Sequence, residues 1–298
     1  MSNVDPLKQE HHYLPQFYQR RWVGSDGKLT VFSRPHDIVV AKRRSPRATG
    51  KEPGLYAVPI APLTEQNALE DRFWRTLDQW GADALAALER DDPTGLAPLD
   101  RERWAVVLLA MMFRDPWSVA RINLSARDHY TTGFAEFSAR YAELRAPHEP
   151  ETYDEFVAAF DHPGLSEFGA QILRSFATNK AVRGQLLAMN WQVVAISDAP
   201  LSLLTSDRPV IRFKGLKEPD GLLMLPLGPN SFFVAYNNGP LDMRREIHES
   251  IVHGRFLEAM NEYVVGSAVR HAYGFDDSQL SLVERTLRRE GDPILPRW

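Results

Sequence analysis

The segment HHYLPQFYQRRW, which starts at His11, concentrates residue types that carry out chemistry. Histidine binds metal ions or carries protons near neutral pH, and the planar guanidinium of arginine grips phosphate or carboxylate groups. In a regular strand His11 and His12 would face opposite sides, so both serve one site only if the backbone before Pro15 is irregular. We therefore take His11, His12, Arg20 and Arg21 as candidate site residues. The alternative is that backbone groups hold the histidines and that the arginines cover aromatic rings.

A second segment, LLTSDRPV, places polar residues directly after an apolar run. Asp207 would stand at the end of a predicted strand, where a carboxylate is rigidly held yet open to solvent, and would bind a metal ion or act as a general base. The same residues also suit an ordinary Asx-turn, in which Asp207 caps its own backbone. Both interpretations stay open at this stage.

Three further polar residues lie within apolar segments. Glu70 shares a predicted helix with Leu69, and a charge on such a helix is usually solvated. Arg114 follows the apolar run that ends in MMF, where it either reaches solvent or is paired inside a cleft. Asn261 stands inside a predicted helix, and because asparagine is a mediocre helix former we expect it to make a polar contact.

Composition and motif searches exclude several classes of protein. The 298 residues carry a formal charge of −4 and include no cysteine, which rules out a disulfide scaffold, a thiolate zinc site, an iron–sulfur cluster and a cysteine nucleophile. The sequence lacks GxxxxGK[ST] and GxSxG motifs and a GxGxxG that opens a helix, so we expect no nucleotide cofactor. The length fits one domain, and we predict a single domain over residues 1–298.

Charge is distributed unevenly along the chain. Residues 1–52 contain ten Lys and Arg against five Asp and Glu. A basic N-terminal face on an acidic body would attract phosphate groups. The alternative is that the basic run from Lys42 to Arg47 is a solvated loop.

Hydropathy gives no sign of a targeting or membrane segment. The N-terminal residues lack an apolar signal core, and the longest apolar run, Trp104–Phe113, has ten residues. A membrane span needs about 20 residues. We therefore expect a cytoplasmic protein without a membrane partner.

The N-terminal segment, residues 10–60, is predicted to form β structure. Apolar residues at 22–23 and 29–32 flank a turn cluster at 24–27, which is typical of a hairpin, and residues 38–40 would add a third strand.

Residues 64–189 are predicted to form a helical body. Apolar residues recur every three or four positions from Leu69 to Leu88, which is typical of an amphipathic helix. We expect further helices over residues 100–113, capped by Asp100 and ended or kinked by Pro116, and over 119–144, 153–160 and 165–189.

Residues 191–237 are predicted to be rich in strands, because short apolar runs alternate with Pro, Gly, Asp and Asn. The expected strands are 191–197, 201–205, 210–213, 222–227 and 232–236, and helices are expected over 245–271 and 278–289. Segregated helices and strands predict an α+β fold, with a mostly α-helical body, an N-terminal β-hairpin segment and a C-terminal antiparallel or mixed sheet.

Several blocks of the chain resemble one known family. HHYLPQFYQRRW followed by GKLTVFSR looks like the opening of the domain-of-unknown-function 4238 family, and LYAVP, ALEDRFW, LLTSDRPV, LPLGPNSF and MNEYVVGSAVRHAYG are similar to its later blocks. The resemblance runs from His11 to about Gly274, with Leu14 and Gln19 in place of the usual Val and Leu. It implies that seven residues fall at polar motif positions of the family, namely His11, His12, Arg21, Glu70, Arg114, Asp207 and Asn261. It implies no particular reaction.

Imidazole, carboxylate and guanidinium groups without a cofactor fingerprint suggest a metal-assisted hydrolase, most simply a phosphodiesterase or nuclease. In this hypothesis a divalent ion (Mg, Mn or Zn) binds His11 or His12 together with Glu70 and Asp207. The ion would supply hydroxide, and Arg21 and Arg114 would neutralise the phosphoryl oxygens. The other polar candidates for the cleft are Arg20, Ser206 and Asn261.

Two other classes stay open. A non-enzymatic protein would use the basic N-terminal face to bind nucleic acid or an acidic partner, while His11 and Asp207 hold the fold. A helical interaction scaffold would instead expose apolar patches around Trp80 or Phe137.

Overall fold

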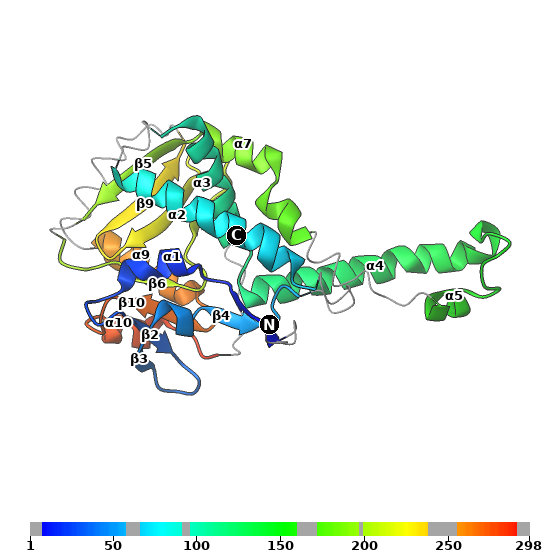
Figure 1. The fold of residues 1–298 in the computed structure, drawn as a ribbon, viewed down its shortest axis with the longest axis horizontal. Coiled ribbons are helices and arrows are strands. Elements are labelled where there is room, and N and C mark those ends of the chain that lie inside the picture. Colours follow the sequence, from blue (N-terminus) through cyan, green and yellow to red (C-terminus); the bar gives the residue numbers. More distant parts are fainter. Residues whose placement is uncertain are drawn as a thin grey trace, which may run out of the picture.

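Helices and antiparallel sheets pack as layers in the computed structural model, which describes residues 8–57, 66–90, 96–159, 172–196, 199–237 and 255–290 (Figure 1). The fold is α+β, as the segregation of helical and strand patterns predicts.

A four-stranded antiparallel sheet forms the centre of one half of the molecule. Its strands, in spatial order, are β5 (Asn190–Ala195), β9 (Ser231–Tyr236), β8 (Leu222–Gly228) and β7 (Ile211–Phe213). Side chains alternate between its faces: Leu223 and Leu225 pack with α2 (Arg75–Arg90) and α3 (Pro98–Met111), whereas Met224 packs with α9 (Arg255–Ser267). The sheet is therefore covered by helices on both faces.

A second antiparallel sheet joins the two ends of the chain. Its order is β3 (Val40–Arg44), β2 (Leu29–Ser33), β10 (His271–Gly274) and β6 (Thr205–Ser206). Phe32 and Ala272 of this sheet pack with Val265 of α9 and Val283 of α10 (Leu280–Thr286). The N-terminal hairpin is thus completed by strands that lie far along the chain.

The segment HHYLPQFYQRRW forms a strand and two helical turns that contact both sheets. The elements are β1 (Glu10–His12), which pairs with β4 (Lys51–Pro53), then α1 (Gln16–Gln19) and the 3₁₀ turn η2 (Arg20–Trp22); a second 3₁₀ turn, η3 (Pro46–Ala48), precedes β4. The Tyr18 hydroxyl donates to the Pro226 carbonyl at 2.7 Å, and Trp22 Nε1 donates to the Leu203 carbonyl at 2.9 Å.

The helical body begins with a π-helix, η4 (Leu69–Trp74), which leads into α2. Long helix α4 (Pro116–Leu144) projects from the rest of the molecule, with α5 (Tyr153–Ala159) beside its far end (Figure 1). Helix α3 ends at Met111, before Pro116, and Pro116 begins α4, where the Asp115 carboxylate accepts the Ser118 amide at 3.0 Å as an N-cap. Residues 172–177 are helical, and α7 (Lys180–Ala188) follows.

Three sequence predictions about element ends are wrong for local reasons. Residues 22–23 form no strand, because buried Trp22 completes the turn η2 and bonds to Leu203. The strand predicted at 38–40 starts at Val40. Helix α3 is not capped by Asp100; it begins at Pro98, a residue favoured at the first helical position, and Asp100 lies in its first turn.

Two further predictions fail because distant polar groups satisfy the backbone. Strand β6 is shorter than the predicted 201–205, since the amide of Leu204 donates to the Asn261 side chain. The helix predicted to reach His271 ends at Ser267, because the carboxylate of Asp207 binds the next amides and the chain turns into β10. Of the predicted helical residues, 160, 165–171 and 245–254 lie outside the described residues.

Within the ranges that the structure describes, no helix combines the length and the apolar character that a membrane crossing requires.

Candidate active site

Strand β1 separates the two adjacent histidines, as the alternation of side chains in a strand predicts. His11 is fully buried; its Nδ1 accepts the backbone amide of Tyr56 at 3.0 Å, and its ring stacks on the Tyr56 ring at 5.6 Å between centroids. Burial lowers the pKa of His11, opposed by a hydrogen bond to the Asn67 side chain. His11 therefore holds the fold and does not line the pocket described below.

His12 faces the other side of β1 and lines a pocket. Burial lowers the pKa of its imidazole, and the nearby charges of Lys51 and Arg114 lower it further, so the ring is neutral at pH 7. Its Nε2 is shielded from solvent and has no hydrogen-bond partner among the described residues. The ring also makes a hydrogen bond to the Pro46 backbone, which tends to raise the pKa of His12. We assign that bond to Nδ1, which leaves the Nε2 lone pair unused.

Glu70 lies in the π-helix η4 and lines the same pocket. Burial raises the pKa of its carboxyl group to about 7, against the opposing charge of Arg114, and Oε2 has no hydrogen-bond partner among the described residues. π-Helical turns are rare and occur often at functional sites. A carboxyl group that titrates near neutral pH beside an unpaired imidazole marks this pocket as a functional candidate.

Cations from the N-terminal segment form one wall of the pocket: Arg20 at the end of α1, Arg47 in η3 and Lys51 in β4. Lys51 Nζ lies 3.8 Å from Glu10 Oε1. Gly50, with φ of +65°, brings η3 and β4 against α1, where a Cβ would lie 2.6 Å from Gln19 Nε2.

Helix α2 and its π-helical start form the opposite wall. Arg75 Nη2 lies 2.8 Å from Asp71 Oδ1, and Asp78 Oδ1 accepts a hydrogen bond from Arg114 Nη1 at 2.6 Å. Arg114 is itself buried, and its Nη2 donates to the His12 carbonyl at 2.6 Å. This one guanidinium therefore joins the strand that carries His12 to the helix that carries Asp78.

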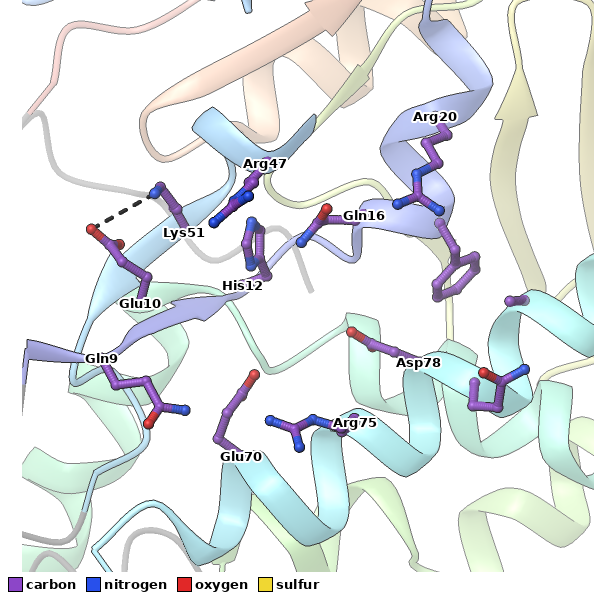
Figure 2. A pocket seen from close by; sticks show the side chains of 13 residues that line it. Gln9, Glu10, His12, Gln16, Arg20, Arg47, Lys51, Glu70, Arg75 and Asp78 are labelled. Carbon is purple, nitrogen blue, oxygen red and sulfur yellow. Dashed lines mark ion pairs between the residues drawn. The ribbon is translucent and has the colours of Figure 1, made fainter. Parts of the chain in front are cut away.

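Between these walls lies a cavity of about 590 Å³. Figure 2 shows His12 near its centre, with Arg47 and Gln16 on one side and Glu70, Arg75 and Asp78 on the other. The full lining is Gln9, Glu10, His12, Gln16, Phe17, Arg20, Arg47, Lys51, Glu70, Arg75, Asp78, Gln79 and Ala82.

Asp207 and Ser206 do not line this pocket. The carboxylate of Asp207 is buried and accepts three backbone amides, from Val269, Arg270 and His271, at 2.7 to 2.9 Å. Burial raises its pKa, although those hydrogen bonds oppose the shift. Ser206 Oγ accepts the amide of Arg208 at 3.1 Å. The carboxylate of Asp207 is thus neither open to solvent nor capping its own backbone; it holds the backbone of a distant segment, and Ser206 makes the local turn.

Asn261 and Arg21 also have structural contacts away from the pocket. Asn261 is fully buried; its side chain accepts the amide of Leu204 and donates to the Ser202 carbonyl and the Gln279 side chain, at 2.8 to 2.9 Å. Arg21 Nε donates to the Leu227 carbonyl at 3.2 Å, and its Nη2 pairs with Glu89. Neither residue lines the cavity.

The four predicted metal ligands do not fit one shared ion. His11 and His12 face opposite sides of β1, and the oxygens of Asp207 are occupied by backbone amides. In the described part of the chain, no group of three or more His, Cys, Asp or Glu residues is arranged to hold a metal ion. Of the predicted set, His12 and Glu70 line the pocket.

Sequence reasoning missed most of the pocket's charged residues: Glu10, Arg47, Lys51, Arg75 and Asp78. The excess of basic residues over 1–52 was the available signal for the cations, although Arg47 also suited a solvated loop. Asp78 offered no local signal, because its partner Arg114 lies in the connection between α3 and α4.

Comparison with known proteins gives a family but no characterised relative. No curated protein and no solved structure matches the chain. The model of one family, described as protein of unknown function (DUF4238), matches residues 10–278. That match includes both walls of the pocket and most of the 298-residue chain, so the chain belongs to the DUF4238 family.

Proposed function

We propose that the pocket hydrolyses a phosphodiester bond, with His12 and Glu70 moving the protons and the cationic wall binding the phosphate. The observation that carries this proposal is the presence, in one cavity, of a neutral histidine and a carboxyl group that keeps its proton up to about pH 7. Acid–base catalysis needs one group ready to accept a proton and one ready to donate it at the working pH.

The proposed reaction balances its protons within this pair. A water molecule attacks phosphorus, and its proton passes to Nε2 of His12. The bond from phosphorus to the leaving oxygen breaks, and that oxygen takes the proton of Glu70. The products are a phosphate monoester and an alcohol, and the proton on His12 then returns to the Glu70 carboxylate.

The cationic wall supplies the electrostatic part of the proposal. Negative charge on the phosphoryl oxygens would be stabilised by Arg20, Arg47 and Lys51, which line the same cavity as His12. Arg114 has a positioning role, because it holds the His12 carbonyl and Asp78 together.

The cations also favour a second candidate, a protein that binds nucleic acid or an acidic partner without turnover. Such a protein needs Arg20 and Arg47 but gains nothing from a neutral His12 or a protonated Glu70. Hydrolysis therefore separates the two candidates.

The test measures release of 4-nitrophenolate from bis(4-nitrophenyl) phosphate by the full chain, in chelator and then with added magnesium, manganese or zinc. We expect His12→Gln to lower kcat/KM by about 100-fold or more, because one proton-transfer group is lost. The matched control is His36→Gln, which changes an exposed histidine outside the pocket and should leave the rate unchanged. Equal rates for wild type and His12→Gln under every metal condition would overturn the proposal.

A further inference from the structure

The two walls of the pocket differ in charge. Arg20, Arg47 and Lys51 lie on the wall built by the N-terminal segment, whereas Glu70 and Asp78 lie on the wall built by η4 and α2 (Figure 2). Arg75 shares the second wall but already pairs with Asp71. An anionic ligand is therefore attracted to the first wall, whereas the second wall offers it no free positive charge, because Arg75 pairs with Asp71 and Asp78 is held by Arg114.

Two of the cations are available to a ligand. Among the residues that the structure describes, the side chains of Arg20 and Arg47 have no hydrogen-bond or ion-pair partner, and both are exposed at the edge of the cavity. Guanidinium groups bind phosphate oxygens in pairs of parallel hydrogen bonds. One phosphate diester bound between them would lie beside His12, which lines the same cavity.

The rest of the lining suits a flat polar ring. Phe17 is the aromatic side chain of the lining. Gln16, its neighbour in sequence, and Gln79, on the facing helix α2, supply amide donors and acceptors. The position of Phe17 depends on close approach to α2, since a Cβ at Gly81 would lie 2.4 Å from Phe17 Cζ. Aromatic side chains bind nucleic acid bases by stacking.

The size of the cavity sets an upper limit on what enters it. At about 590 Å³ it falls in the range of pockets that enclose one small organic molecule, about 300–1,000 Å³. Proteins that bind a nucleic acid duplex use a broad positive surface of about 600 Å² or more, because a duplex carries phosphates on two strands. A hollow with available cations on one wall only offers no partner to the phosphates of that second strand.

We infer that the substrate is a small nucleotide-type phosphodiester, of about dinucleotide size, whose phosphate binds Arg20 and Arg47 and one of whose bases stacks on Phe17. This inference rests on the proposed function and narrows it, since it excludes duplex nucleic acid as the substrate.

The test is a calorimetric titration of the full chain with three probes at equal salt: a dinucleoside monophosphate, a 12-residue single strand and the matching 12-base-pair duplex. The dinucleotide should bind at least tenfold tighter than the duplex. The double variant Arg20→Gln/Arg47→Gln should weaken dinucleotide binding about tenfold or more, and the charge-matched control Arg44→Gln/Arg255→Gln should not, because neither residue lines the cavity.

A second variant separates the base from the phosphate. Phe17→Leu should weaken dinucleotide binding about tenfold and leave the weaker binding of dimethyl phosphate, which has no base, unchanged. Tighter binding of the duplex, or equal losses for both small probes in Phe17→Leu, would overturn this inference while leaving hydrolysis by His12 and Glu70 to stand. Binding of all probes unchanged by Arg20→Gln/Arg47→Gln would overturn the assignment of the phosphate to this pocket as well.

Discussion

The pocket around His12 and the buried junction around Asp207 are built from the same kinds of polar residues but differ in how those residues are satisfied. At the junction, Asp207 accepts three backbone amides and Asn261 makes three hydrogen bonds. At the pocket, His12 Nε2 and Glu70 Oε2 are shielded and have no partner in the described chain. Saturated polar groups fix a backbone, whereas a buried polar atom without a partner carries an energetic cost, which binding or catalysis would explain at this pocket.

The adjacent pairs His11–His12 and Arg20–Arg21 show that neighbouring residues of one type can have a structural role and a pocket position. His11 and Arg21 bond to backbone groups of distant segments, and their sequence neighbours line the pocket. Position in a motif therefore does not identify a catalytic residue; the face of the element on which the residue lies does.

The largest effect should come from Asp207→Ala. Removing the carboxylate leaves three backbone amides without an acceptor, and each such loss costs about 1–3 kcal/mol, so we expect the free energy of unfolding to fall by about 4 kcal/mol. Urea denaturation measures this change. The control Asp220→Ala removes an exposed carboxylate and should leave stability nearly unchanged. Equal stability of the two variants would mean that Asp207 does not hold the junction.

Arg114→Met should have the next largest effect and should lower both stability and hydrolysis. It leaves Asp78 and the His12 carbonyl without their buried partner, at a cost of about 3 kcal/mol in the free energy of unfolding. Hydrolysis should fall with it, because strand β1 and α2 lose their connection. The control is Arg140→Met, which breaks an exposed pair with Glu143 and should change neither quantity. Normal melting of Arg114→Met would contradict the role given to Arg114.

Glu70 should make stability depend on pH in a direction opposite to that of a salt-bridged acid. Its folded pKa of about 7 lies above the ordinary value of 4.5, so between these values the folded protein binds more protons than the unfolded chain. Stability should therefore fall as pH rises from 4.5 to about 7, by about 2 kcal/mol after allowance for partial exposure of the group. Glu70→Gln should remove this slope in urea titrations at several pH values.

The same group should shape the pH profile of hydrolysis. Activity should be highest above the lowered pKa of His12 and below about pH 7, where Glu70 still carries its proton. A rate that keeps rising well above pH 7 would contradict the role of Glu70 as the proton donor.

Arg21→Gln should have the smallest effect. Its bonds to the Leu227 carbonyl and to Glu89 are partly exposed, so we expect a loss of about 1 kcal/mol or less in the free energy of unfolding and no change in hydrolysis. A clear loss of hydrolysis in Arg21→Gln would show that Arg21 also belongs to the pocket.

Local patterns predicted much of the fold. The periodicity of α2, the apolar run of α3 and the short apolar strands β8 and β9 are visible in the sequence, because each element buries its own face. The pairing of β2 with β10 and of β1 with β4 was not predicted, since nothing in one strand specifies a distant partner.

The candidate site was predicted only in part, because local sequence does not specify contacts between distant segments. His12 and Arg20 stand in an unusual local string, Glu70 falls at a polar motif position of the family, and the structure brings all three to one pocket. Asp207 was equally unusual, but its oxygens are saturated by amides more than sixty residues away. Only the three-dimensional contacts distinguish a carboxylate that holds the backbone from one that is left for a ligand.

The most direct test of the account is nitrogen-15 NMR of the histidine rings, without and with dimethyl phosphate. In the free protein, His11 should carry its proton on Nε2, because Nδ1 accepts the Tyr56 amide, and His12 should carry its proton on Nδ1. On addition of the phosphate diester, the His12 resonances should shift to saturation while those of His11 stay in place. A His12 ring that does not respond, or a response of His11 equal to that of His12, would contradict the assignment of the pocket as the site of phosphodiester chemistry.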